Sequence, residues 1–291
     1  MEKRKKLVKF VISMVIFGTN GYLVAHISLS SAQIVLMRTL LGSLFLVVIV
    51  ALTGRFDFKA LKHDWLNATL GGACLGLNWV LLFTAYREAS VSLATLTYYC
   101  GPMIVLMLSP LIFHEKLTWN KLAALAAVAI GMICISGNLD AERAGGLLWA
   151  GGAAVLYALL IIFNKKVSQL NGLHCALFEL CVAFLVVLCY LTLQGQLNSL
   201  MPSAQDLPWV LAIGLVNTGL AYYLYFSSLQ KLPAQTVALI CYIDPLTALL
   251  VSALLLEEPL GPVQLLGAVL ILGGACLGEV VIKKRNKLTR R

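Results

Sequence analysis

The sequence predicts an all-α integral membrane protein whose ten transmembrane helices form two five-helix repeats of inverted topology. Composition, the length of the apolar runs and an internal repeat predict this fold. Of the 291 residues, 60% are hydrophobic and only 12% are charged, which is too little polar surface to cover a soluble globule. The apolar runs are continuous and do not alternate with polar residues, so helices are expected and a β-barrel is not.

The apolar runs set the number of spans. A spanning helix needs about 20 mostly apolar residues, so the chain has room for about ten spans with short connections and for no soluble domain. We expect spans at residues 7–27, 32–53, 65–86, 91–113, 119–137, 146–164, 173–193, 208–228, 234–256 and 262–282.

Residues 240–260, ICYIDPLTALLVSALLLEEPL, resemble residues 97–117, TYYCGPMIVLMLSPLIFHEKL, at an offset of 143 positions. A constant offset over about sixty residues indicates an internal duplication. The aligned pairs are Tyr99 with Tyr242, Pro102 with Pro245, Ser109 with Ser252, Glu115 with Glu258, Gly76 with Gly219, Phe83 with Phe226 and Gly131 with Gly274.

The two repeats are expected to divide in the polar loop at 137–145. The first repeat would comprise residues 1–140, and the second would comprise residues 141–291 with a basic tail. Because five is an odd number of spans, the second repeat must enter the membrane from the opposite side. Inverted repeats of this kind support alternating access in many secondary transporters.

The distribution of basic residues predicts the orientation in the membrane. The net charge is +9, but all except three of the 22 Lys and Arg residues fall in segments that are cytoplasmic if the N-terminus is inside. The exceptions are Arg87 and Arg143 in outer loops and Arg38 within the second span. This split predicts a multi-pass protein with both termini in the cytoplasm. The basic tail is assigned to anionic lipids, and nucleic acid is not expected as a partner.

The expected substrate site consists of polar and aromatic residues within the spans. Asp244 lies directly before Pro245, whose ring frees a backbone carbonyl inside the helix. Spans three, four, eight and nine are expected to supply most of the cavity, with contributions from spans one and six. The predicted substrate-binding residues are Asn20, Asn78, Tyr98, Tyr99, Asn217, Tyr222, Tyr242 and Asp244. The tyrosines could instead be packing residues in the core or at the membrane interface.

Four further residues are predicted to act in coupling or gating: Arg38, Glu179, Pro102 and Pro245. A charge within a span is costly unless it extends to the interface, pairs or faces water. Arg38 is close enough to the outer surface for its side chain to extend there, and this interpretation stays open beside a role in the cavity. Pro102 frees the carbonyl of Tyr98 in the same way as Pro245 frees that of Cys241.

Enzyme motifs are absent from the sequence. It contains no H-E-x-x-H, no G-x-S-x-G and no P-loop, so we predict no enzyme, no cofactor and no metal. Asp244 and Glu179 could in principle do acid–base work, which leaves an intramembrane enzyme as the alternative of a different class.

The pattern resembles the EamA family of the drug/metabolite transporter superfamily over essentially the whole chain. The resemblance rests on a proline in the fourth helix of each half, on the acidic residue before Pro245, and on the helix-end motifs His114-Glu115-Lys116-Leu117 and Glu257-Glu258-Pro259-Leu260. It implies a carrier of the bacterial plasma (inner) membrane with a central cavity shared by the two halves. Many members of this family export amino acids or related metabolites.

A carboxylate near the membrane centre with tyrosines around it suits a substrate that carries an ammonium group. We therefore expect a secondary active transporter, working by alternating access, for an amino acid or another amine-bearing metabolite, with export favoured over uptake. The alternative is a neutral substrate such as a nucleoside or sugar, with Asp244 protonated for coupling. Coupling to protons or to the membrane potential is expected, as is a homodimer through the glycines of span ten, Gly267, Gly274 and Gly278.

Overall fold

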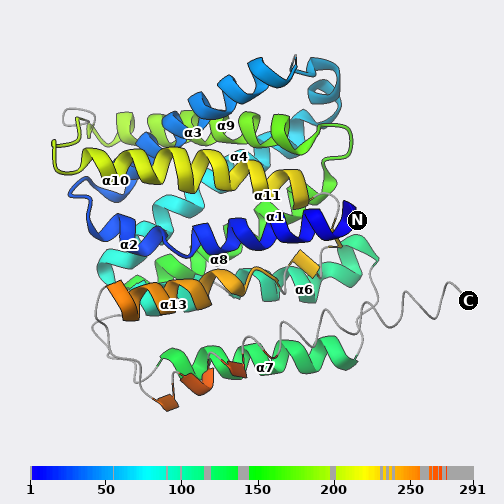
Figure 1. Cartoon of the computed structure of the whole chain (residues 1–291), viewed down its shortest axis with the longest axis vertical. Coiled ribbons are helices and arrows are strands. Elements are labelled where there is room, and N and C mark those ends of the chain that lie inside the picture. The colour runs from blue at the N-terminus through cyan, green and yellow to red at the C-terminus, as the bar shows by residue number, and fades with distance from the viewer. Residues whose placement is uncertain are drawn as a thin grey trace, which may run out of the picture.

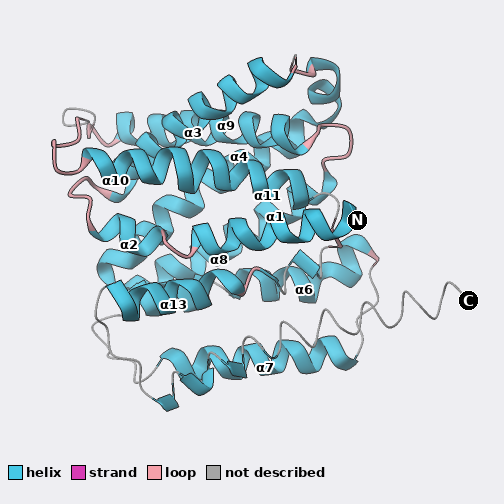
Figure 2. Cartoon of the chain, in the orientation of Figure 1, coloured by secondary structure: helices cyan, strands magenta, loops and turns pink. Residues whose placement is uncertain are grey.

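The computed structural model describes residues 2–54, 56–89, 91–98, 100–114, 119–136, 144–196, 201–229, 232–233, 236–237, 240–255, 262–263, 265–267, 269–270 and 273. The regular secondary structure of these residues is helical, with loops and turns between the helices and no strand (Figure 2). Six helical runs are long and apolar enough to cross a membrane: Arg4–Ala25, Ser31–Thr53, Phe58–Glu88, Gly145–Lys166, Gly172–Leu193 and Leu207–Leu229. They coincide with the first, second, third, sixth, seventh and eighth expected spans.

The first three spans differ from the expected ones in two places. α1 (Glu2–Phe17) is separated from α2 (Asn20–Ala25) by a turn, and α3 (Ser31–Thr53) follows. α4 (Phe58–Glu88) begins earlier than the expected span at residue 65. Asp57 explains the difference, because its side chain accepts hydrogen bonds from the backbone N–H groups of Lys59 and Ala60 and so caps a polar first turn.

The remaining helices follow the expected order. They are α5 (Val91–Tyr98), α6 (Cys100–Phe113), α7 (Trp119–Ser136), α8 (Ala144–Lys166), α9 (Gly172–Leu193), α10 (Leu207–Leu211), the π-helix η2 (Ala212–Leu220), α11 (Ala221–Leu229) and α13 (Ile243–Leu255). α10, η2 and α11 form one continuous run. The boundary loop at 137–143, the basic tail, parts of the fourth, ninth and tenth expected spans and the tenth-span residues Gly274 and Gly278 lie outside the described residues.

The helices lie side by side with roughly parallel axes (Figure 1). The main contacts join helices that are far apart in the sequence: α4 packs on α8 and α9, α3 packs on α9 and η2, and α1 packs on α11. The first and second parts of the chain are therefore interleaved, and the core runs between them.

Two of these interfaces contain a glycine at a point where the neighbouring helix approaches closely. A Cβ atom on Gly72 of α4 would lie 2.8 Å from the carbonyl oxygen of Glu179 on α9. A Cβ atom on Gly219 of η2 would lie 2.7 Å from the ring of Phe45 on α3. Each glycine thus leaves room for atoms of the neighbouring helix that a larger residue would displace.

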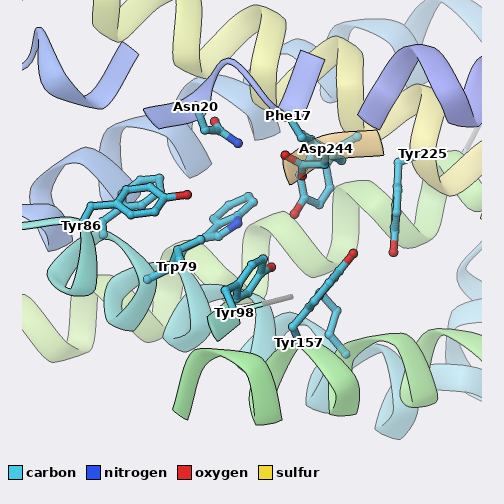
Figure 3. A pocket seen from close by; sticks show the side chains of 12 residues that line it. Phe17, Asn20, Trp79, Tyr86, Tyr98, Tyr157, Tyr225 and Asp244 are labelled. Carbon is cyan, nitrogen blue, oxygen red and sulfur yellow. The ribbon is translucent and has the colours of Figure 1, made fainter. Parts of the chain in front are cut away.

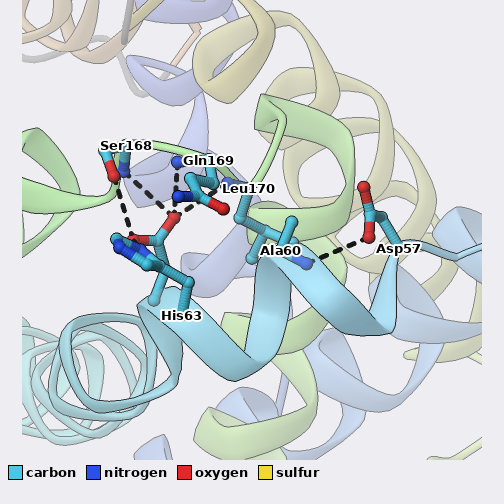
Figure 4. A network of polar contacts seen from close by, with 7 residues as sticks. Asp57, Ala60, His63, Ser168, Gln169 and Leu170 are labelled. Carbon is cyan, nitrogen blue, oxygen red and sulfur yellow. Dashed lines mark hydrogen bonds and ion pairs between the residues drawn. The ribbon is translucent and has the colours of Figure 1, made fainter.

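Aspartates hold loops at the ends of the bundle. Asp64 Oδ2 accepts hydrogen bonds from the backbone N–H groups of Ser168, Gln169 and Leu170 at 3.0, 2.7 and 2.8 Å (Figure 4). Asp206, directly before α10, accepts hydrogen bonds from the backbone N–H and the hydroxyl of Ser28 at 3.0 and 2.5 Å. Each aspartate links the start of one helix to a loop that is remote in the sequence.

Candidate functional site

A cavity with a largely aromatic lining lies between the helices, and side chains from α1, α2, α4, α5, α8, α11 and α13 surround it (Figure 3). The cavity volume is about 40 Å³, enough to hold water. The lining residues are Phe17, Asn20, Trp79, Leu82, Phe83, Tyr86, Tyr98, Tyr157, Leu160, Tyr222, Tyr225 and Asp244.

Two segments of irregular backbone lie beside this cavity: the turn between α1 and α2, and the π-helix η2. Between α1 and α2 the hydroxyl of Thr19 donates a hydrogen bond to the carbonyl of Ile16 at 2.7 Å. Asn217 of the π-helix η2 also reaches this turn, because its Nδ2 donates to the Ile16 carbonyl at 3.1 Å and to Asn20 Oδ1 at 3.2 Å. Within a membrane, non-helical backbone is tolerated where protein or a water-filled cavity satisfies it. Here Asn217 donates a hydrogen bond to a backbone carbonyl at the helix break beside the cavity.

Asp244 lies in the first turn of α13. The chain turns at Cys241 and Tyr242, and the backbone N–H of Asp244 donates to the carbonyl of Cys241 at 3.2 Å. The N-terminal turn of a helix favours a negative charge. A Cβ atom on Gly18 would lie 2.8 Å from the carbonyl oxygen of Asp244, so the glycine at the α1–α2 break lets α13 approach. The carboxylate is thereby positioned at the cavity wall (Figure 3).

Aromatic rings form the rest of the wall. Trp79 and Tyr222 meet edge to face with centroids 5.1 Å apart, and Tyr98 stacks on Tyr157 at 4.8 Å. Phe17 packs against Tyr222 at 5.2 Å. Aromatic faces carry negative electrostatic potential and attract cations. A carboxylate beside such a wall is chemically suited to an ammonium group.

The predicted substrate-binding residues divide into three groups. Asn20, Tyr98, Tyr222 and Asp244 line the cavity together. Asn217 does not line it but is hydrogen-bonded to Asn20, while Tyr242 and Asn78 are buried at 2% and 0% exposure outside the lining. Tyr99 lies outside the described residues.

Several lining residues were missed from the sequence. Trp79, Phe83 and Tyr86 of α4 line the cavity with Leu82, and their spacing of three and four places them on one helix face. That spacing could have identified them, and a spacing of three also relates Tyr157 to Leu160 and Tyr225 to Tyr222. Phe17 carries no comparable signal. Among the described residues, no group of three or more His, Cys, Asp or Glu could hold a metal ion.

Arg38 does not extend to the membrane surface, so that interpretation of its side chain is wrong. It is fully buried, and its Nε donates a hydrogen bond to Thr218 Oγ1 at 2.9 Å. The guanidinium carbon lies 3.8 Å from the centroid of the Trp79 ring. The hydroxyl and the indole face of neighbouring helices hold the side chain inward, since both interactions would be lost at the surface.

Glu179 is also fully buried and has neutral hydrogen-bond partners. Its Oε2 accepts from Asn164 Nδ2 at 3.1 Å, and its Oε1 accepts from Cys175 Sγ at 3.7 Å. The side chain packs against Gly71 of α4. Pro245 is buried in the first turn of α13, and Pro102 belongs to α6, with its side chain outside the described part.

Comparison with known sequences identifies the family. The sequence profile of the EamA-like transporter family matches twice, over residues 5–137 and 144–278. The chain belongs to the EamA-like transporter family. This EamA-like transporter is therefore a multi-pass membrane protein with a general role in moving small molecules.

Individual relatives span most of the EamA-like chain. The transporter YxxF of Bacillus subtilis (strain 168) is 28% identical over 98% of this chain and 92% of its own length. The threonine/homoserine exporter RhtA of Escherichia coli (strain K12) is 22% identical over 87% of this chain and 83% of its own. A crystal structure with a TM-score of 0.80 and 18% identity covers 97% of this chain and 98% of its own, so the same fold is present there.

Proposed function

We propose that this EamA-like transporter is a secondary active carrier that exports an amino acid or another amine-bearing metabolite by alternating access. The observation that carries the proposal is the position of Asp244, whose carboxylate lines a cavity walled by aromatic rings from five helices. An ammonium group would gain an ion pair with Asp244 and cation–π contacts with the rings. The name of RhtA, a threonine/homoserine exporter, agrees with this substrate class.

The proposal of alternating access rests on an inverted repeat of five helices, with units at residues 1–140 and 141–291. The double match of the family profile supports it, and so does the similar packing of α9 on α4 and of α3 on η2. In this arrangement ten spans leave both termini in the cytoplasm of the bacterial inner membrane. Cysteine labelling on a cysteine-free background tests the topology. Labelling from outside at position 2 or 290, but not at position 141, would contradict it.

A single substitution, Asp244→Asn, tests the substrate site. The amide is nearly isosteric, so we expect a folded protein that binds the amine-bearing ligand less tightly, by about 3 kcal/mol or less. A screen of the purified protein by thermal shift against amino acids, amines and nucleosides supplies the ligand. Normal affinity and normal gradient-driven flux in the variant would remove Asp244 from the site.

The same variant separates a coupling role from substrate binding. If Asp244 carries a coupling proton for a neutral substrate, Asn mimics the protonated state. Substrate exchange then persists, while flux driven by a pH gradient disappears. A purely structural aspartate would instead lower the melting temperature without changing transport per folded molecule.

A further inference from the structure

Arg38 is a buried charge that does not line the cavity, so the candidate site gives it no role. Its Nε is bonded to Thr218, but neither Nη1 nor Nη2 has a hydrogen-bond partner among the described residues. Buried polar groups in native proteins almost always have partners, and each exception calls for an explanation. A guanidinium without a counter-ion is costly to hold inside a membrane protein.

The position of Arg38 relates it to the cavity. Its guanidinium stacks on Trp79 at 3.8 Å and lies 5.4 Å from the centroid of Phe83, and both rings line the cavity. Asp244 lines the same cavity. The cavity therefore has a carboxylate on its lining and a guanidinium directly behind its aromatic wall.

We propose that Arg38 binds the carboxylate of a zwitterionic substrate whose ammonium group is held by Asp244. The substrate class would then be α-amino acids, and this inference rests on the proposed function of Asp244. Two parallel N–H donors match the two oxygens of a carboxylate, which is the geometry that arginine offers and lysine does not. The bound carboxylate would supply partners for Nη1 and Nη2 and would balance the buried charge.

Binding requires Trp79 to move. The cavity volume of about 40 Å³ is far below that of pockets that enclose small-molecule ligands. A rotation of the Trp79 ring away from Arg38 would enlarge the cavity and uncover the two Nη groups in one step. We therefore expect amino-acid binding to change the tryptophan fluorescence of the wild type, and Trp79→Phe to remove most of that change.

The test compares three ligands that share one side chain: the amino acid that most raises the melting temperature of the purified wild type, its decarboxylated amine and its deaminated acid. For threonine, these are isopropanolamine and β-hydroxybutyrate. We expect Arg38→Met to bind the amino acid at least tenfold more weakly and the amine with unchanged affinity. Asp244→Asn should weaken binding of the amine and leave that of the acid unchanged.

Arg38→Lys keeps the charge without the paired donors, so its affinity for the amino acid should fall between those of wild type and Arg38→Met. If Arg38→Met weakens amine and amino acid equally, Arg38 has only a structural role and the inference is wrong. If Arg38→Met does not fold, the wild type decides, because equal affinity for the amine and the amino acid would overturn the inference.

The two proposals fail differently. If amine binding depends on Asp244 but the carboxylate of the amino acid adds nothing to the affinity, only the role of Arg38 is overturned. A wild type that binds no amino acid and no amine overturns both the inference and the amine-bearing substrate class.

Discussion

Arg38 on α3 and Glu179 on α9 occupy matching positions, because each is the eighth residue after the capping residue of its helix, Ser30 or Asn171. Both side chains are fully buried. α3 packs on η2 and α9 packs on α4, so each position faces a helix from the other region that matches the family profile. One position carries a cation and the other a carboxyl group.

Glu179 is expected to tolerate an amide but not a truncation. Glu179→Gln keeps a hydrogen bond with Asn164, whereas Glu179→Ala leaves Asn164 Nδ2 without this acceptor and opens a cavity. We expect the alanine variant to lose about 2–4 kcal/mol of stability in thermal or denaturant unfolding. If Glu179 carries a coupling proton, Glu179→Gln should lose flux driven by a pH gradient while exchange continues. Unchanged pH-driven flux in Glu179→Gln, with Glu88→Gln as the control, would exclude that role.

Asp64 holds the loop between α8 and α9. Asp64→Ala removes the acceptor of three backbone N–H groups, so we expect a loss of about 3–5 kcal/mol in the free energy of unfolding. Faster proteolysis of the loop at 167–171 should accompany this loss.

Asp57→Ala is the matched control for Asp64→Ala. Asp57 lies two turns earlier and its side chain caps α4 (Figure 4), so its removal should cost about 1 kcal/mol. Equal losses for the two variants would show that the link from Asp64 to the loop contributes little.

Asp206 should make stability depend on pH. Hydrogen bonds from the hydroxyl and backbone N–H of Ser28 and from Ser203 hold the pKa of Asp206 below its ordinary value. A depressed pKa stabilises the fold fully above the ordinary carboxyl pKa of about 3.9, and this contribution is lost as the pH falls through the folded pKa. The melting temperature of wild type should therefore exceed that of Asp206→Asn near neutral pH, and the difference should shrink in acid. A difference that stays constant down to about pH 3 would contradict this assignment.

Gly72 is expected to be sensitive to one added methyl group. In Gly72→Ala the Cβ atom would lie 2.7 Å from the Val182 Cβ and 2.8 Å from the Glu179 carbonyl oxygen, so α4 and α9 must separate. We expect a loss of about 1–3 kcal/mol, measured as a lower melting temperature. Gly151→Ala on α8 is the control, because a Cβ atom there meets no atom within 4 Å. Its stability should stay equal or rise by up to about 1 kcal/mol.

The sequence alone determined the class of protein, because membrane spans follow from local properties. Apolar run length and composition predicted the six long helical runs nearly to their ends. α4 begins before its expected span because the Asp57 cap extends the helix beyond the apolar run. The family resemblance, later shown by the profile match, likewise depended on short motifs. Asp244 and Tyr222 were predicted because polar and aromatic groups within a span need a reason to be there.

Only the tertiary structure decided which of these groups share a cavity and what surrounds Arg38. Helix periodicity fixes the face on which a residue lies, but the rotation of each helix depends on its neighbours. Asn78 and Tyr242 therefore could not be separated from Asn20 and Tyr98 in advance. The same holds for Arg38, whose guanidinium on α3 stacks on the ring of Trp79 on α4. Such contacts between residues far apart in the chain leave no local pattern in the sequence, since packing creates them.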